Sequence, residues 1–241
     1  MRVPAPVPSR APHGQTRSYA TASRSTEGGT VSADKTLSWS YTEEFPHEDE
    51  PTAEARLRGI ELGIAPVSPA TGAALKMLAA AAGAKSVAEI GTGTGVSGLC
   101  LLGGMGADGV LTTIDIEPEL QREARRTFEA AGYPGARTRI IRGRASDVMP
   151  RMAARSYDMV VLDVDPEESA KLAGAALRML RVGGVLAITR ALWNDHVADP
   201  ARRDPTTVAA RELGKTLRGH DSVLVSLLPV GDGLLIAVRQ A

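Results

Sequence analysis

Residues 86–115 read SVAEIGTGTGVSGLCLLGGMGADGVLTTID, and this stretch decides the fold of the chain. Its ends are two short apolar runs, residues 87–90 before Gly91 and residues 110–114 before Asp115. Apolar runs of this length, bounded by glycine or by an acid, predict buried parallel strands. The residues between them predict a glycine-rich turn followed by one helix. We therefore expect a strand–loop–helix–strand unit here.

The loop has the chemistry of a nucleoside-binding half-site. Gly91, Gly93 and Gly95 permit a tight turn and a close approach of backbone to a ligand. Asp115, at the tip of the second strand, can accept hydrogen bonds from both hydroxyls of a ribose. Glycine loops also occur for packing reasons alone, so their spacing matters. A dinucleotide-binding fold prefers its third glycine one place further on, where this chain has Val96.

The observed spacing, Glu89-x-Gly-x-Gly-x-Gly, resembles motif I of the class I S-adenosylmethionine (SAM) methyltransferases. Asp115 matches the acid that ends the second strand of those enzymes. A nicotinamide oxidoreductase, or another α/β domain, is the alternative, and binding of NAD(H) in place of SAM would identify it.

Composition excludes several classes of partner. The 241 residues include 28 Lys and Arg and 28 Asp and Glu, so the formal net charge is zero and favours neither nucleic acid nor an anionic membrane. No apolar run approaches the ~20 residues that span a bilayer. Cys100 is the single cysteine, which excludes an internal disulfide and favours a cytoplasmic location. We interpret Cys100, in an apolar helical segment, as a small buried hydrophobe rather than a nucleophile.

The N-terminal fifth of the chain differs from the rest. Residues 1–30 are rich in Pro, Ser, Thr, Ala, Gly and Arg, have no acid before Glu27, and are expected to be disordered. Trp39, Tyr41 and Phe45 then precede an acidic stretch, which is either an arm that docks on the domain or on a second subunit, or a solvated linker. We therefore divide the chain into a disordered or partly ordered extension, residues 1–50, and a methyltransferase domain, residues 51–241, which could form a homodimer.

Two helices are expected before the glycine loop. The first begins near Thr52 and ends at Gly63, with Ala53, Leu57, Ile60 and Leu62 as its apolar face. The second begins at Ser68-Pro69 and ends at Gly83, with Leu75, Met77 and Leu78 as its buried face.

After Asp115 the α/β alternation continues to the end of the chain. Strands are expected at residues 138–141, 158–163, 185–189, 222–228 and 234–239, and helices at residues 117–132, 166–180 and 206–217, with Ser146-Asp147 capping a short additional helix. Residues 229–233, PVGDG, predict a hairpin between the last two strands. The predicted fold class is α/β: a Rossmann-like class I methyltransferase with a seven-stranded, mostly parallel sheet, an antiparallel C-terminal hairpin and helices on both faces.

A narrower resemblance extends over residues 65–239. The chain is similar to the catechol and caffeoyl-CoA O-methyltransferase family, particularly its bacterial members. The matching segments are EIGTGTGVSGL from Glu89, GVLTTIDIEP from Gly109, YDMVVLDVD from Tyr157, LRVGGVLAI from Leu180, ALWNDHVADP from Ala191 and LPVGDGLLIAVR from Leu228.

The resemblance implies SAM as the cofactor and assigns residues to it. The implied cofactor-binding residues are Val67 in the segment before the second helix, Glu89, Gly91, Thr92, Gly93 and Gly95 in the loop, Ser97 for the carboxylate, Asp115 for the ribose, Ala145 with Ser146 for the adenine, and Asp163 near the methionine amine.

The catalytic half departs from the family. Its members hold a divalent metal ion with the aspartate that ends strand four and an Asp-Asn pair that ends strand five, and they place a lysine three residues beyond the first aspartate. Here Asp163 remains, but the lysine position is Pro166 and the Asp-Asn pair is Thr189-Arg190. An arginine can neither ligate a cation nor act as a base. We therefore predict no metal site.

Three further residues are catalytic candidates beside Asp163. Arg190 supplies a positive charge where the metal would lie, Asp165 follows strand four, and His196 lies in the loop after strand five. Each has a structural alternative: Arg190 as a salt-bridge partner of Asp163, Asp165 as a helix N-terminal charge, and His196 as an exposed loop residue.

These features predict a SAM-dependent O-methyltransferase that methylates a hydroxyl of a small phenolic or anionic acceptor without a tightly bound metal. The alternative is a SAM-binding protein with little or no methyl transfer, acting as a sensor or interaction partner. Turnover distinguishes the two.

Overall fold

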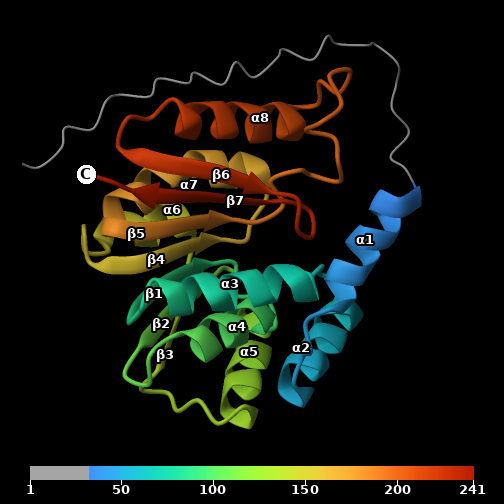
Figure 1. Ribbon diagram of the computed structural model, residues 1–241. Coiled ribbons are helices and arrows are strands. Elements are labelled where there is room, and N and C mark those ends of the chain that lie inside the picture. Colours follow the sequence, from blue (N-terminus) through green and yellow to red (C-terminus); the bar gives the residue numbers. More distant parts are fainter. Residues whose placement is uncertain (1–32) are drawn as a thin grey trace, which may run out of the picture.

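The computed structural model describes residues 33–241, and the disorder expected for residues 1–30 lies outside the described residues. Its centre is a seven-stranded sheet in the order β3-β2-β1-β4-β5-β7-β6 (Figure 1). The strands are β1 (Ser86–Ile90), β2 (Val110–Asp115), β3 (Thr138–Arg142), β4 (Tyr157–Leu162), β5 (Leu180–Ile188), β6 (Val223–Leu228) and β7 (Leu234–Arg239). Strands β1 to β5 pair in parallel, and β7 is antiparallel to both β5 and β6. The predicted fold class is confirmed.

Helices cover both faces of this sheet (Figure 1). One layer contains α3 (Pro69–Ala81), α4 (Val96–Gly104) and α5 (Pro118–Ala130), with α2 (Glu50–Glu61) packed against α4 and α5. The other contains α6 (Ala145–Val148), the 3-10 turn η1 (Met149–Arg151), α7 (Pro166–Met179) and α8 (Pro205–Arg218). None of the helices within residues 33–241 is both long and apolar enough to cross a bilayer.

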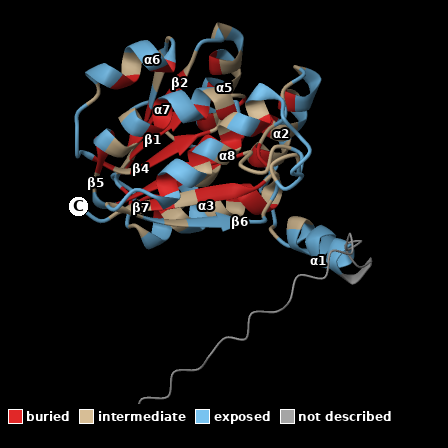
Figure 2. Cartoon of the chain, turned by 90° about the horizontal axis from the view of Figure 1, so that it is seen from above, coloured by how far each residue is buried: buried red, intermediate tan, exposed pale blue. Residues whose placement is uncertain are grey.

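Side chains of the central strands point alternately to the two faces of the sheet, so each helix layer packs on its own hydrophobic core. In β1, Val87 faces the core under α3, α4 and α5, whereas Ala88 and Ile90 face the core under α7. Buried residues therefore follow the strands through the middle of the molecule (Figure 2). Each large apolar side chain buried here contributes about 1.5–3 kcal/mol, so the two cores supply most of the folding free energy.

Two helix faces differ from the prediction. Leu57 and Ile60 are 62% and 60% exposed, and Met77 of α3 is 68% exposed. Helix α2 instead buries the small residues Thr52, Ala55 and Gly59. Small side chains let its backbone approach the glycine loop, where the hydroxyl of Thr94 donates to the carbonyl of Ala55 at 2.7 Å. Close backbone approach, rather than apolar area, decides which side of α2 faces inward.

The short helix after β3 also begins differently. Ser146 and Asp147 were expected to cap it, but both lie inside α6, whose N-cap residue is Arg144. Cys100 is half-buried in α4, and burial raises the pKa of its thiol to about 12. It is therefore a neutral thiol at neutral pH, as expected of a packing residue.

The acidic stretch before α2 docks on the domain. Residues Ala33–Glu44 form helix α1, and Glu43 accepts a hydrogen bond from the N–H of Gly231 at 2.7 Å. Glu48 accepts two hydrogen bonds from the guanidinium of Arg56, at 2.9 and 2.5 Å. The aromatic side chains Trp39, Tyr41 and Phe45 stay 45%, 68% and 74% exposed. Charged side chains therefore make polar contacts between this arm and the domain.

Replacing Asp158 by asparagine tests a junction at the N-terminal ends of three central strands. The Asp158 carboxylate accepts from the N–H groups of Lys85 and Ser86 at 2.8 Å and from Arg181 Nε at 2.6 Å, which joins the beginnings of β1, β4 and β5. Burial alone would raise the pKa of Asp158, but these donors hold it below the usual 3.8. The stabilisation is therefore present above pH 3.8 and is lost as pH falls through the lowered value.

We expect Asp158→Asn to lower the free energy of unfolding at pH 7 by about 1–3 kcal/mol, measured by urea unfolding. The difference from the unmodified protein should shrink as pH falls below 3.8, because the Asp158 carboxylate is then progressively protonated. Asp108→Asn, which removes an exposed ion pair with Lys85, is the control and should have a much smaller effect. Equal effects of the two substitutions would contradict this account.

Candidate functional site

The candidate site lies where β1 and β4, neighbours in the sheet, end. Their following loops run to opposite sides, and ligands of α/β sheets bind at such a switch point. Two adjoining cavities of about 200 and 170 Å³ open here and share Gly91, Asp115 and Val164. The glycine loop and residues 64–67 line the first, and residues 143–146 line the second.

The glycine loop is shaped by a close approach of backbone to backbone. Gly91 has φ +94°, and a Cβ atom on it would overlap the carbonyl oxygen of Asp163. Gly95 has φ +95°, and a Cβ atom there would lie 3.1 Å from the ring of Phe128 in α5. Both positions thus require glycine, for conformation and for space.

Asp115 holds the loop in place. Its Oδ2 accepts hydrogen bonds from the N–H groups of Thr92 and Gly93 at 2.9 and 3.1 Å, and its Oδ1 accepts from the N–H of Glu117 at 2.9 Å. The carboxylate therefore lies at the junction of the two cavities and is oriented by three backbone donors.

Glu89 is completely buried beneath the loop. Its Oε2 accepts from the hydroxyl of Thr113 at 2.6 Å, and Thr113 in turn lies 2.8 Å from the hydroxyl of Thr92. Its Oε1 has no hydrogen-bond partner among the described residues. Burial raises the pKa of Glu89 to about 8, although the hydroxyls of Thr113 and Ser97 oppose the rise. The carboxyl is thus predominantly protonated at neutral pH.

Asp163 directly follows β4 and contacts Thr189 and Arg190, the two residues that follow β5. Its Oδ1 accepts from the hydroxyl of Thr189 at 2.6 Å and lies 3.4 Å from Nε of Arg190. Arg190 Nη2 also donates to the carbonyl of Ala65 at 2.8 Å, so this side chain links β5 to the segment that lines the first cavity. Burial raises the pKa of Asp163, and the charge of Arg190 and the Thr189 hydroxyl act against that rise.

These residues do not fit a divalent metal ion. Hard cations require several oxygen ligands, usually carboxylates and carbonyls. Asp163 is the one acid of the three, Thr189 already donates to it, and Arg190 brings a positive charge into the space that a cation would need. Within residues 33–241 no three His, Cys, Asp or Glu side chains gather closely enough to hold a metal.

The other predicted site residues divide into two sets. Val67, Thr92 and Ser97 line the first cavity, and Ala145 lines the second, so the cofactor candidates converge on one region. Asp165 and His196 line neither cavity. Asp165 occupies the N-cap position of α7, although its side chain makes no capping hydrogen bond.

The profile of an O-methyltransferase family matches residues 51–240 of this chain. The chain belongs to this O-methyltransferase family. A protein of Mycobacterium ulcerans, named provisionally as an O-methyltransferase, is 48% identical over 193 residues, which cover 80% of this chain and 86% of the relative. The similarly named Rv1220c of Mycobacterium tuberculosis is 46% identical over 202 residues, covering 84% of this chain and 90% of the relative.

Solved structures agree with this assignment. A protein of Corynebacterium glutamicum superposes with a TM-score of 0.80 at 35% identity, covering 87% of this chain and 98% of that one. The O-methyltransferase TomG of Streptomyces achromogenes, involved in tomaymycin synthesis and crystallised with SAM, has a TM-score of 0.76 at 25% identity, with coverage of 86% and 96%. The resemblance to O-methyltransferases expected from the sequence is confirmed.

Two residues that organise this O-methyltransferase's loop after β5 have no sequence signature. Arg211 of α8 donates to the carbonyls of His196, Val197, Asp199 and Arg202. Asp232, in the turn between β6 and β7, accepts from the N–H of Asn194 at 2.6 Å. Trp193, Asn194 and Asp195 are consecutive left-handed residues, a conformation that persists only when neighbours enforce it. In the sequence Arg211 looks like any surface cation on an amphipathic helix.

Replacing Glu89 by glutamine tests the buried proton. Between pH 4.5, the ordinary pKa, and about 8, the folded protein keeps a proton that the unfolded chain releases. A raised carboxyl pKa means that stability falls as pH rises through this window, by about 1.4 kcal/mol per pH unit, and levels off above it. The Glu89→Gln variant has no carboxyl to titrate at this position, so its stability lacks this pH-dependent contribution. Urea unfolding from about pH 5 to about pH 9 should show the difference, and parallel profiles for the two proteins would contradict a protonated Glu89.

Proposed function

We propose that this chain transfers the methyl group of SAM to a hydroxyl of a small phenolic or anionic acceptor, without a tightly bound metal ion. The observation that carries this proposal is the pairing of Asp163 with Thr189 and Arg190. In the family it resembles, the corresponding positions hold a metal. Here a guanidinium occupies that region instead.

The chain uses SAM as its cofactor, and the two cavities fit it. SAM supplies an electrophilic methyl group on a positively charged sulfur. We assign its adenine to the cavity lined by Ala145 and its methionine portion to the cavity lined by Val67 and Ser97, with Asp115 at the ribose between them. Asp163 lines this cavity and gives the methionine end a carboxyl group that matches a cationic ligand.

Arg190 sets the class of acceptor. Its guanidinium can hold a phenolate or carboxylate by two hydrogen bonds. One delocalised charge polarises a hydroxyl less than a divalent ion does, so it lowers the acceptor's pKa less. Acceptors that are already acidic or anionic therefore suit this site best.

Several parts of the proposal rest on the sequence alone. Roles for Asp165 and His196 in proton transfer stay predictions, since neither lines the cavities. The domain boundary at residue 51, a homodimer, a cytoplasmic location and the absence of nucleic-acid or membrane partners also stay predictions.

Asp115→Ala tests the cofactor assignment. The substitution removes the acceptor for the ribose hydroxyls and also frees three backbone N–H donors, two of them in the glycine loop. We expect SAM to bind at least about tenfold more weakly by calorimetry, because each lost charge-assisted hydrogen bond costs about 1.5–3 kcal/mol at most. Asp221→Ala, at an exposed position outside both cavities, is the control and should bind SAM normally. Unchanged SAM affinity in Asp115→Ala would overturn the assignment.

Arg190→Ala tests the catalytic proposal. In a labelled-methyl screen over catechols, other phenols and aromatic acids, turnover of the unmodified protein should be insensitive to chelator and should not rise with Mg²⁺. Arg190→Ala should lose at least about tenfold in kcat/KM, because the acceptor loses its cation and Asp163 its partner. Added Mg²⁺ should not restore it, since Thr189 and Pro166 still lack the family's ligand and base.

The exposed Arg125→Ala is the control for charge and should retain full activity. A Mg²⁺ requirement in the unmodified protein, or full activity in Arg190→Ala, would defeat the metal-independent mechanism. Tight SAM binding without methyl transfer to any acceptor would favour the sensor function instead.

A further inference from the structure

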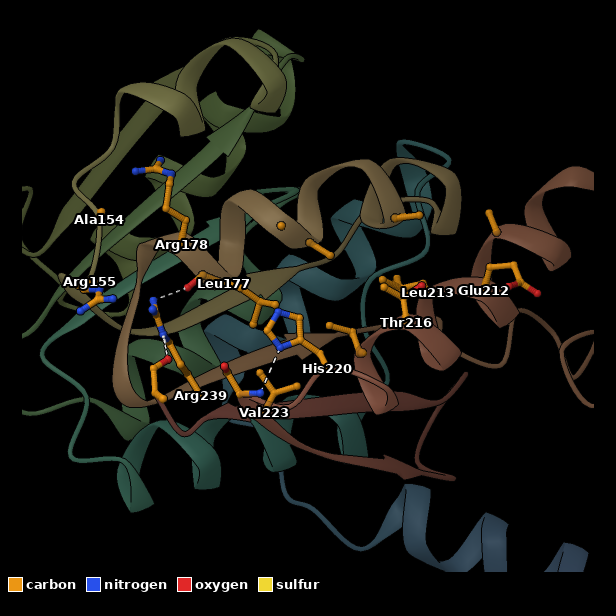
Figure 3. A pocket seen from close by; sticks show the side chains of 17 residues that line it. Ala154, Arg155, Leu177, Arg178, Glu212, Leu213, Thr216, His220, Val223 and Arg239 are labelled. Atoms are coloured by element: carbon orange, nitrogen blue, oxygen red, sulfur yellow. Dashed lines mark hydrogen bonds between the residues drawn. The ribbon is translucent and has the colours of Figure 1, made fainter.

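A larger cavity, of about 630 Å³, lies between α7 and α8, away from the SAM site. Helix α7 begins at Pro166, close to Asp163, and runs toward the N-terminal ends of the parallel strands. Its residues from Ala170 to Arg178 line this cavity. The first residue of β6, Val223, and the last of β7, Arg239, close its other side (Figure 3). Cavities of this size commonly hold drug-sized ligands.

The walls of the cavity are mostly apolar and built from small or aliphatic side chains. They come from both helices and from β6: Ala170, Ala173, Gly174 and Leu177 of α7, Ala209, Leu213 and Leu217 of α8, and Val223. The small residues keep space open between the helices that larger side chains would fill. The apolar part of a ligand that packs against these walls would therefore be removed from water.

Positive charge gathers at one end. Arg155, Arg178 and Arg239 lie there, whereas Glu212 lies at the other end (Figure 3). Arg178 donates to the carbonyls of Met149 and Met152, and these neutral partners orient the guanidinium without cancelling its charge. Arg239 donates to the carbonyls of Leu177 and Leu180 and also to the terminal residue Ala241.

Arg155 and His220 have hydrogen-bonding capacity left for a ligand. The guanidinium of Arg155 makes no hydrogen bond or ion pair with any residue in the described range 33–241. His220 accepts a hydrogen bond from the N–H of Ser222 on Nδ1 at 3.2 Å. The proton of the neutral ring therefore resides on Nε2, which remains a free donor in the lining of the cavity.

We propose that this cavity is a second ligand site, which binds a small amphipathic monoanion such as a medium-chain carboxylate. The apolar portion packs between α7 and α8, and the carboxylate lies at the arginine end, where it accepts hydrogen bonds from Arg155. The chain's own residues 1–32 do not match this chemistry, because they carry four arginines and a single acid, Glu27.

Binding of decanoate, measured by isothermal titration calorimetry on the full chain, tests the proposal. Saturating S-adenosylhomocysteine keeps the SAM site occupied during the titration, so decanoate cannot bind there. We expect saturable binding of one decanoate per chain and no saturable binding of decyltrimethylammonium, which has the same alkyl chain and the opposite charge. Equal binding of both probes would overturn the assigned ligand class.

Gly174→Leu blocks the cavity without disturbing the fold. A Cβ atom on Gly174 meets no heavy atom within 4 Å, so a leucine there projects into open space, and it also favours the helix. We expect this variant to lose decanoate binding and to keep SAM affinity. Gly214→Leu is the matched control, because Gly214 is a helical glycine of α8 with equally open surroundings outside this cavity. It should bind decanoate as the unmodified protein does.

Arg155→Gln tests the anion end. Loss of one charge-assisted hydrogen bond should weaken decanoate by about tenfold, while Arg125→Gln on α5 should change nothing. Undiminished binding in Gly174→Leu or Arg155→Gln, or no saturable binding to the unmodified protein, would overturn the proposal. So would a dimer in sedimentation that Gly174→Leu dissociates, since a second copy of the chain would then be the natural occupant.

Discussion

The structure depends on the contact between the end of β1 and the end of β4. Gly91 lies so close to the carbonyl of Asp163 that any side chain at this position would collide with backbone. This contact brings the first residue of the glycine loop against the acid that follows β4, at the switch point of the sheet. The two cavities on either side of Asp115 exist because the backbones can approach there. Helix α2 also covers the loop, because its small residues Ala55 and Gly59 let the two backbones approach closely.

Carboxyl groups concentrated at this point need compensation, because an isolated buried charge costs several kcal/mol. The protein compensates them in different ways. Glu89 keeps a proton, since no cation reaches it and its pKa is about 8. Asp115 accepts three backbone N–H groups. Asp163 accepts a hydrogen bond from Thr189 and forms an ion pair with Arg190. Only the last arrangement brings a guanidinium to the ends of β4 and β5, and the proposed preference for acidic acceptors follows from it.

The loop after β5 shows how distant residues shape this region. Its left-handed residues Trp193 to Asp195 are held by Asp232 on one side and by Arg211 on the other. The same β6–β7 turn that carries Asp232 also receives Glu43 from α1. The N-terminal arm and the C-terminal hairpin therefore meet next to the loop on which an acceptor site would depend.

The sequence by itself determined the fold class, the order of strands and helices from residue 51 onward, and most of the residues that gather at the two cavities beside Asp115. These follow from local signals: apolar runs of strand length, glycines where φ is positive, and an acid at the end of β2. It also indicated that Thr189 and Arg190 stand where the resembling family has metal ligands, and the absence of a metal stays a prediction. Only the tertiary structure decided which face of α2 is buried, that Asp165 and His196 lie outside the cavities, and that Arg211 organises the loop. Those outcomes depend on which backbones approach closely and on which distant carbonyls a side chain can reach, and no local pattern of residues encodes either.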